Sequence, residues 1–191
     1  MEHPIQIATY YNYQAKDGAL VRKDGDTEIR VAAISGRLKY IGIRKATLPK
    51  VELEFLDIRL LGSDNVYYCL SLNVEYSPAS NIFNVVPCIN PNTPLMIKAF
   101  KDKEYTALCV FQEGKALKYA YTKDDPKGKP DWISTRKGWD RTDEITFFIN
   151  SLEPLAAKIT EINKATQEPS AKSAISDLPI DELFNDVPPG W

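Results

Sequence analysis

The stretch that decides the fold runs from residue 77 to residue 94 and reads SPASNIFNVVPCINPNTP. Its first half predicts a short helix over residues 81–86, capped by the Pro-Ala-Ser-Asn sequence that begins at Pro78. Its second half contains three prolines and predicts a loop. The segments on both sides alternate between apolar and polar residues, which is typical of β-strands. One short helix inserted between two sets of strands therefore organises the predicted architecture.

Five β-like segments precede this helix, at residues 5–13, 27–34, 37–44, 51–61 and 66–75. In the third segment, alternation predicts a core face with Leu38 and Tyr40 and a basic face with Arg37 and Lys39. The last two segments flank the turn sequence Gly-Ser-Asp-Asn at 62–65, which predicts a hairpin. In its second arm Tyr67 falls on the polar side, where its ring is placed either to stack on a ligand or to pack across strands.

Three further strands are expected after the proline-rich loop, at residues 95–101, 105–112 and 117–123, joined by tight turns. Residues 124–132 are too rich in proline and glycine to form an element. Beyond Thr142, a candidate N-cap, apolar residues recur at helical spacing, and Pro154 is expected to kink or divide the helix. This order predicts a mainly β protein: an OB-type five-stranded Greek-key barrel with extra strands or a hairpin, one short inserted helix and a C-terminal helix.

Composition limits the possible functions. The net charge is −2, but residues 1–168 contain 23 bases and 22 acids, so any basic surface must come from clustering of the bases. Three separated cysteines and a single histidine, His3, supply no four-ligand zinc set, and we expect neither a cofactor nor a metal. No apolar run approaches the ~20 residues of a membrane span, and the first residues do not form a signal peptide. We therefore expect a cytoplasmic protein without membrane contact.

The final segment, residues 176–191, reads SDLPIDELFNDVPPGW. It holds four carboxylates, no Lys or Arg, three prolines and a terminal Trp, and the preceding residues are small and polar, so a disordered acidic tail is expected. The ending resembles that of phage and bacterial single-stranded DNA-binding proteins, which close an acidic tail with an aromatic residue. The resemblance implies that replication or recombination proteins bind the tail. The residues that carry the resemblance, and that are expected to bind the partner, are Asp186, Val187, Pro188, Pro189 and Trp191.

Three segments are expected along the chain: an OB-fold DNA-binding domain at 1–141, a helical segment at 142–164, and a linker with the acidic tail at 165–191. The densest basic and aromatic stretch is 123–141, with two Trp and six bases against four acids. Single-stranded DNA exposes bases and phosphates together, so its binders interleave flat side chains with cations. We expect bases to stack on Tyr67, Trp132 and Trp139, and phosphates to contact Arg37, Lys39, Lys127, Lys129, Arg136 and Lys137.

The predicted function is sequence-nonspecific binding of single-stranded DNA, which the protein protects in replication, recombination or repair. The acidic tail is expected to recruit partner proteins and to compete with the DNA for the binding groove. The protein is expected to act in the host cytoplasm if a phage encodes it, and it is a possible homo-oligomer. One alternative is an OB-fold adaptor that recruits replication factors without touching DNA. A metal-dependent nuclease would need carboxylates such as those in the Asp124-Asp125 pair or in Asp140 and Asp143, but no motif places a Lys or His base beside them. The sequence is therefore not expected to encode an enzyme.

Overall fold

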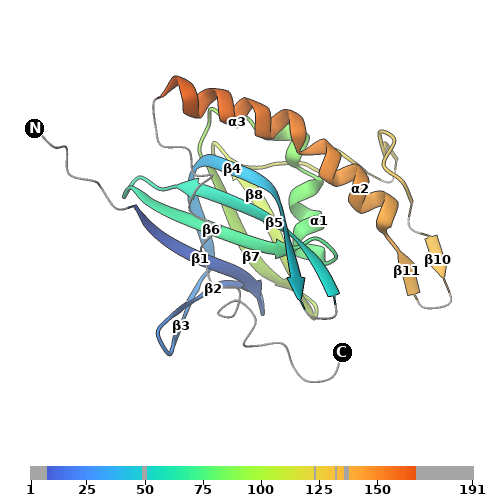
Figure 1. Ribbon diagram of the computed structural model, residues 1–191, viewed down its shortest axis with the longest axis horizontal. Helices are drawn as coiled ribbons and strands as arrows, with labels where there is room; N and C mark the ends of the chain where they lie inside the picture. The colour runs from blue at the N-terminus through green and yellow to red at the C-terminus, as the bar shows by residue number, and fades with distance from the viewer. Residues whose placement is uncertain (1–7, 49–50, 123, 132, 136–137, 167–191) are drawn as a thin grey trace, which may run out of the picture.

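A computed structural model describes residues 8–48, 51–122, 124–131, 133–135 and 138–166. Nine strands of this part form one mixed sheet with the order β3-β2-β1-β6-β5-β4-β7-β8-β9 (Figure 1). The strands are β1 (Thr9–Lys16), β2 (Ala19–Asp24), β3 (Thr27–Val31), β4 (Ala33–Leu48), β5 (Val51–Leu61), β6 (Val66–Asn73), β7 (Leu95–Asp102), β8 (Tyr105–Gln112) and β9 (Lys115–Ala116). The remaining elements are α1 (Ser77–Phe83), η1 (Val86–Cys88), the hairpin of β10 (Ile133–Thr135) and β11 (Gly138–Asp140), α2 (Thr142–Ser151) and α3 (Glu153–Ala165).

The long strand β4 joins the two halves of the sheet. Residues 33–36 pair with β7 and residues 37–48 pair with β5, both antiparallel. On the other side of β5, β6 is antiparallel to β5 and parallel to β1. The first strand is therefore inserted beside β6, far from its position in the sequence, and brings the β2–β3 hairpin with it.

The two halves of the sheet curl toward each other at the β1–β2 turn. Asp17 and Gly18 form its two-residue loop with φ of 50° and 75°, as a type I′ hairpin turn requires. The Gly18 N–H donates to Thr106 Oγ1 on β8 at 2.9 Å, and a Cβ on Gly18 would lie 2.8 Å from the backbone nitrogen of Lys101. No backbone ladder joins β1 or β2 to β7 or β8 within the described residues, so the sheet curls without closing.

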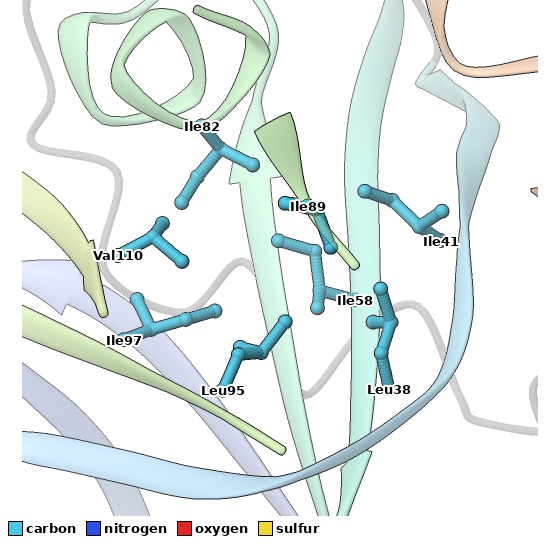
Figure 2. A pocket seen from close by; sticks show the side chains of 8 residues that line it. All are labelled: Leu38, Ile41, Ile58, Ile82, Ile89, Leu95, Ile97 and Val110. Carbon is cyan, nitrogen blue, oxygen red and sulfur yellow. The ribbon is translucent and has the colours of Figure 1, made fainter. Parts of the chain in front are cut away.

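The core fills the space inside this curl. The period of two in β6 turns Leu70 and Leu72 inward, and the helices contribute to the same cluster, where the rings of Phe83 and Phe148 stack at 5.1 Å. Figure 2 shows aliphatic side chains pointing into a common space, yet this cavity measures only about 10 Å³, roughly one water molecule. The lining is wholly aliphatic: Leu38, Ile41, Ile58, Ile82, Ile89, Leu95, Ile97 and Val110. This cavity has no room for a ligand.

Most of the expected strands are present, and the mainly β class is confirmed. The strands 51–61 and 105–112 match their expected bounds, and Pro154 lies where α2 ends and α3 begins. The inserted helix starts at Ser77, earlier than expected, because Pro78 fits the first turn of a helix, where its missing N–H is not needed. The strand expected over 117–123 is wrong, because pairing ends at Ala116 and the Ala120 N–H donates to the carbonyl of Asn84 beside α1.

The third predicted strand contains the most consequential error. A β-bulge between Leu38 and Tyr40 inserts an extra residue at Lys39. Leu38 remains in the core, whereas Tyr40 lies opposite Arg59 on the other face of the sheet. The alternation predicted from the sequence is therefore broken at Lys39, and Leu38 and Tyr40 do not share a face.

Candidate nucleic-acid interface

The side of β1, β6, β5 and β4 that faces away from the core carries aromatic and charged side chains. On β5 the buried apolar residues Leu56, Ile58 and Leu60 point inward, so the alternate residues point outward. The cross-strand register brings residues from all four strands together on this side. We call it the outer face; it comprises Tyr10, Asn12, Arg37, Tyr40, Arg44, Phe55, Asp57, Arg59, Leu61, Tyr67, Cys69 and Ser71.

Two tyrosines form a stack at one end of the outer face. Tyr10 on β1 and Tyr67 on β6 are direct partners in the parallel ladder, and their rings lie 5.0 Å apart with an interplanar angle of 15°. Tyr67 is 7% exposed and Tyr10 is 36% exposed. Burial, followed by the neighbouring Tyr10, raises the pKa of the Tyr67 hydroxyl. The pair thus has a fixed inner ring and a more accessible outer ring.

Arg44 is held in a polar network further along the face. Its Nε donates to Asp57 Oδ2 at 2.8 Å and its Nη2 donates to Ser71 Oγ at 3.0 Å, while the guanidinium lies 4.9 Å from the Phe55 ring centroid. The Ser71 hydroxyl donates in turn to Asp57 Oδ1. Each Asp57 oxygen therefore has a partner, and the charge of Arg44 is largely balanced.

Arg59 occupies the middle of the face without such a partner. It is 2% exposed, its guanidinium lies 4.8 Å from the Tyr40 ring centroid, and its cross-strand partners are Tyr40 and Cys69. Among the described residues, neither Nε nor Nη1 of Arg59 has a hydrogen-bond acceptor. Burial raises the pKa of the Cys69 thiol to about 11, and burial together with Asp57 raises the pKa of Tyr40. The centre of the face is therefore a poorly hydrated environment around an arginine.

The bulge residue Lys39 differs from the exposed cation that the sequence predicted. It is 5% exposed, and its carbonyl accepts a hydrogen bond from Asn163 Nδ2 on α3 at 2.9 Å. Burial, followed by the nearby Arg37, lowers the pKa of its ammonium group. Arg37 itself is exposed and lies opposite Leu61 on the outer face.

The predicted basic-aromatic stretch lies at a different place. Lys129 Nζ and Arg141 Nε bind the two carboxylate oxygens of the buried Glu144 at 3.0 and 2.9 Å. Arg141 also donates to the Glu75 carbonyl and to Ser80 Oγ, which ties this region to the start of α1. Figure 1 shows the β10–β11 hairpin at the start of α2, well separated from β1. Lys129 thus contributes to an internal ion network.

The other predicted site residues are only partly described. Lys127 is exposed, with a left-handed φ of 49° and Asp125 Oδ2 at 3.8 Å from its ammonium group. The backbone of Trp139 belongs to β11, paired with Ser134. Trp132, Arg136, Lys137 and the tail residues 167–191 lie outside the described residues. Of the predicted site, the structure brings Arg37 and Tyr67 together on the outer face and places Lys129 apart from them.

Sequence reasoning missed most of this face, namely Tyr10, Tyr40, Arg44, Phe55 and Arg59. The signal for two of them was present, because Phe55 and Arg59 alternate with the core residues of β5 just as Tyr67 alternates with those of β6. Tyr40 was hidden by the bulge. The stack on Tyr67 could not be foreseen, because it depends on parallel pairing between strands that are distant in the sequence.

Neither a membrane helix nor a metal cluster occurs in the described part of the chain. No helix there is long and apolar enough to cross a membrane. The same residues contain no group of three or more His, Cys, Asp or Glu side chains that could hold a metal ion. Comparison of the whole chain with protein-family models, curated proteins and solved structures gave no match in any of the three.

Proposed function

We propose that this protein binds single-stranded DNA, with little dependence on base order, on the outer face of an OB-type barrel. The observation that carries the proposal is the stacked pair of Tyr10 and Tyr67 on the same face as Arg59. Stacking on aromatic rings accepts any base, because every base has a π-face, while arginines bind the backbone phosphates. A face that combines both groups has the chemistry that single-stranded nucleic acid requires.

The arrangement of the strands supports an OB-type barrel. Strand β4 pairs with both β5 and β7, and α1 follows β6 and precedes β7 in the chain, an arrangement that suits an OB-type barrel. An OB barrel is often partly open, and it binds ligands on the face of its second and third strands. Here those strands are β5 and β6, which carry Arg59 and Tyr67. We assign β1 to β3 as an addition that widens this face.

The proposal is tested by the anisotropy of labelled oligo-dT, with a duplex of matched length at the same ionic strength. Replacing Tyr10 by Ala removes the more accessible ring of the stack, and stacking contributes about 1–3 kcal/mol per base, so we expect affinity to fall about 5- to 150-fold. Tyr119→Ala is the matched control, because Tyr119 is 47% exposed and lies outside the outer face. Equal affinity for single strands and duplex would contradict the proposal.

The role of the tail is a separate part of the proposal. Segment 176–191 combines acidic residues with an apolar, aromatic ending, and such endings are captured by pockets that pair a hydrophobic surface with a basic residue. We assign it to the recruitment of replication or recombination proteins. Trp191→Ala should abolish co-purification of a tail-binding partner and leave oligo-dT affinity unchanged. Loss of both would mean that the tail residue acts through the DNA-binding face.

The adaptor function without DNA binding remains the second candidate, favoured by the same tail. The oligo-dT titration separates the two. An adaptor would show no anisotropy change at any salt concentration while still losing its partner in the Trp191→Ala variant.

A further inference from the structure

Arg59 is an anomaly in the electrostatics of the sheet. Arg22, Arg30 and Arg44 each lie within 3.3 Å of a carboxylate oxygen. Arg59 is the most buried of these arginines, yet within the described residues it forms no ion pair, and its Nε and Nη1 lack acceptors. Burying an unpaired charge is costly, and a buried polar group without a partner in a native protein calls for an explanation such as a bound ion.

The nearest carboxylate on the same strand does not supply the missing partner. Asp57 is two residues from Arg59 and therefore on the same face of β5. Its Oδ2 accepts from Arg44 and its Oδ1 accepts from Ser71. The contact that Arg59 does make is with the Tyr40 ring, which stabilises the cation without satisfying its N–H groups. The site thus holds a buried guanidinium against an aromatic ring and leaves its Nε and Nη1 donors without acceptors among the described residues.

We propose that Arg59 is the anchoring site for a backbone phosphate of the bound strand, beside the Tyr10–Tyr67 stack that holds a base. This deepens the proposed function and rests on it. A phosphate supplies both the negative charge and the acceptor oxygens that Arg59 lacks, and a guanidinium forms strong, charge-assisted hydrogen bonds with it. Tyr67 lies next to Arg59 in the sheet, two residues along β6 from the Arg59 partner Cys69. The stack and the anchor therefore form one compact subsite for a nucleotide.

The first test uses inorganic phosphate as the probe and follows the melting temperature at constant ionic strength. We expect phosphate to raise the melting temperature of the wild-type protein, and Arg59→Met to lose this increase. Arg30→Met is the control, because it removes one exposed arginine on β3, outside the outer face. An equal increase in all three proteins is a general salt effect and overturns the proposal.

The second test measures the salt dependence of oligo-dT binding. Each phosphate of a single strand that the protein ceases to neutralise reduces the slope of log K against log salt by about 0.7. We expect this reduction for Arg59→Met and none for Arg30→Met. Arg59→Lys retains the charge but loses the fork, so it should keep the slope while binding more weakly. Should Arg59→Met fail to fold, the affinity of Arg59→Lys decides instead of the slope, and wild-type affinity in this variant overturns the proposal.

The two proposals fail in different ways. If oligo-dT binds and both arginine variants have the wild-type slope, Arg59 is not the anchor, and the proposed function stands. If oligo-dT does not bind while Arg59→Met still removes the effect of phosphate, the anion site stands and single-stranded DNA is not its ligand.

Discussion

Replacing Glu144 by Ala should destabilise the fold strongly. Glu144 is 4% exposed and holds two cations, Lys129 at 3.0 Å and Arg141 at 2.9 Å. Removing one partner of a fully buried ion pair costs about 3–5 kcal/mol, because an uncompensated charge is left behind. The side chains of Lys129 and Arg141 are 19% and 16% exposed, so water partly compensates them. We therefore expect the free energy of unfolding to fall by about 2–3 kcal/mol.

Urea unfolding measures this change. At about 2–4 °C per kcal/mol for a chain of this size, the melting temperature should fall by roughly 4–12 °C. Glu161→Ala is the matched control, because it removes the same charge from an exposed position of α3 and should alter stability by about 0.5 kcal/mol at most. A loss below about 0.5 kcal/mol for Glu144→Ala would refute the reasoning from burial.

Urea unfolding of a second variant, combined with an oligo-dT titration, decides the role of Lys129. In a double-mutant cycle of Lys129→Ala with Glu144→Ala, an internal ion network predicts a coupling energy of about 0.5–3 kcal/mol. A Lys129→Ala variant that unfolds more easily but binds oligo-dT normally per folded molecule would assign Lys129 to the fold. Weaker binding at unchanged stability would restore it as the phosphate contact that the sequence predicted.

Three further predictions follow from single contacts. Gly18→Ala should lower the free energy of unfolding, measured in urea, more than Gly25→Ala does. Gly18 and Gly25 both have a positive φ, of 75° and 59° respectively, but only Gly18 has neighbouring backbone within 3 Å of the added Cβ. Hydrogen bonding to Asp64 raises the pKa of Tyr68 to about 12 and lowers that of Asp64. Stability from this bond should therefore be lost as pH rises from about 10 to 12 and as it falls below about 4. In pH-resolved unfolding, Tyr68→Phe should remove the alkaline dependence and weaken the acid one, because the Val66 N–H still donates to Asp64. Burial raises the pKa of Cys69 to about 11, so its alkylation at pH 8 should be far slower in the folded protein than in urea, as mass spectrometry of the labelled peptide would report.

The sequence by itself determined the local features of this fold. The hairpin of β5 and β6 could be predicted, because period-two alternation and turn chemistry are properties of neighbouring residues. The order of strands around one inserted helix and the division of the C-terminal helices at Pro154 could be predicted for the same reason. The outward position of Tyr67 also followed from alternation alone.

Only the tertiary structure decided how the outer face is assembled. Tyr10 meets Tyr67 through a parallel pairing across more than fifty residues, and no local pattern specifies which strand a free edge accepts. The bulge at Lys39 moved Tyr40 to the side of Arg59, because one extra residue reverses the facing of every residue after it. Whether a cation has a carboxylate partner likewise depends on distances in space and not on spacing in the sequence. Lys129 pairs with Glu144, fifteen residues away. Arg59 has Asp57 only two residues away, but that carboxylate binds Arg44 and Ser71.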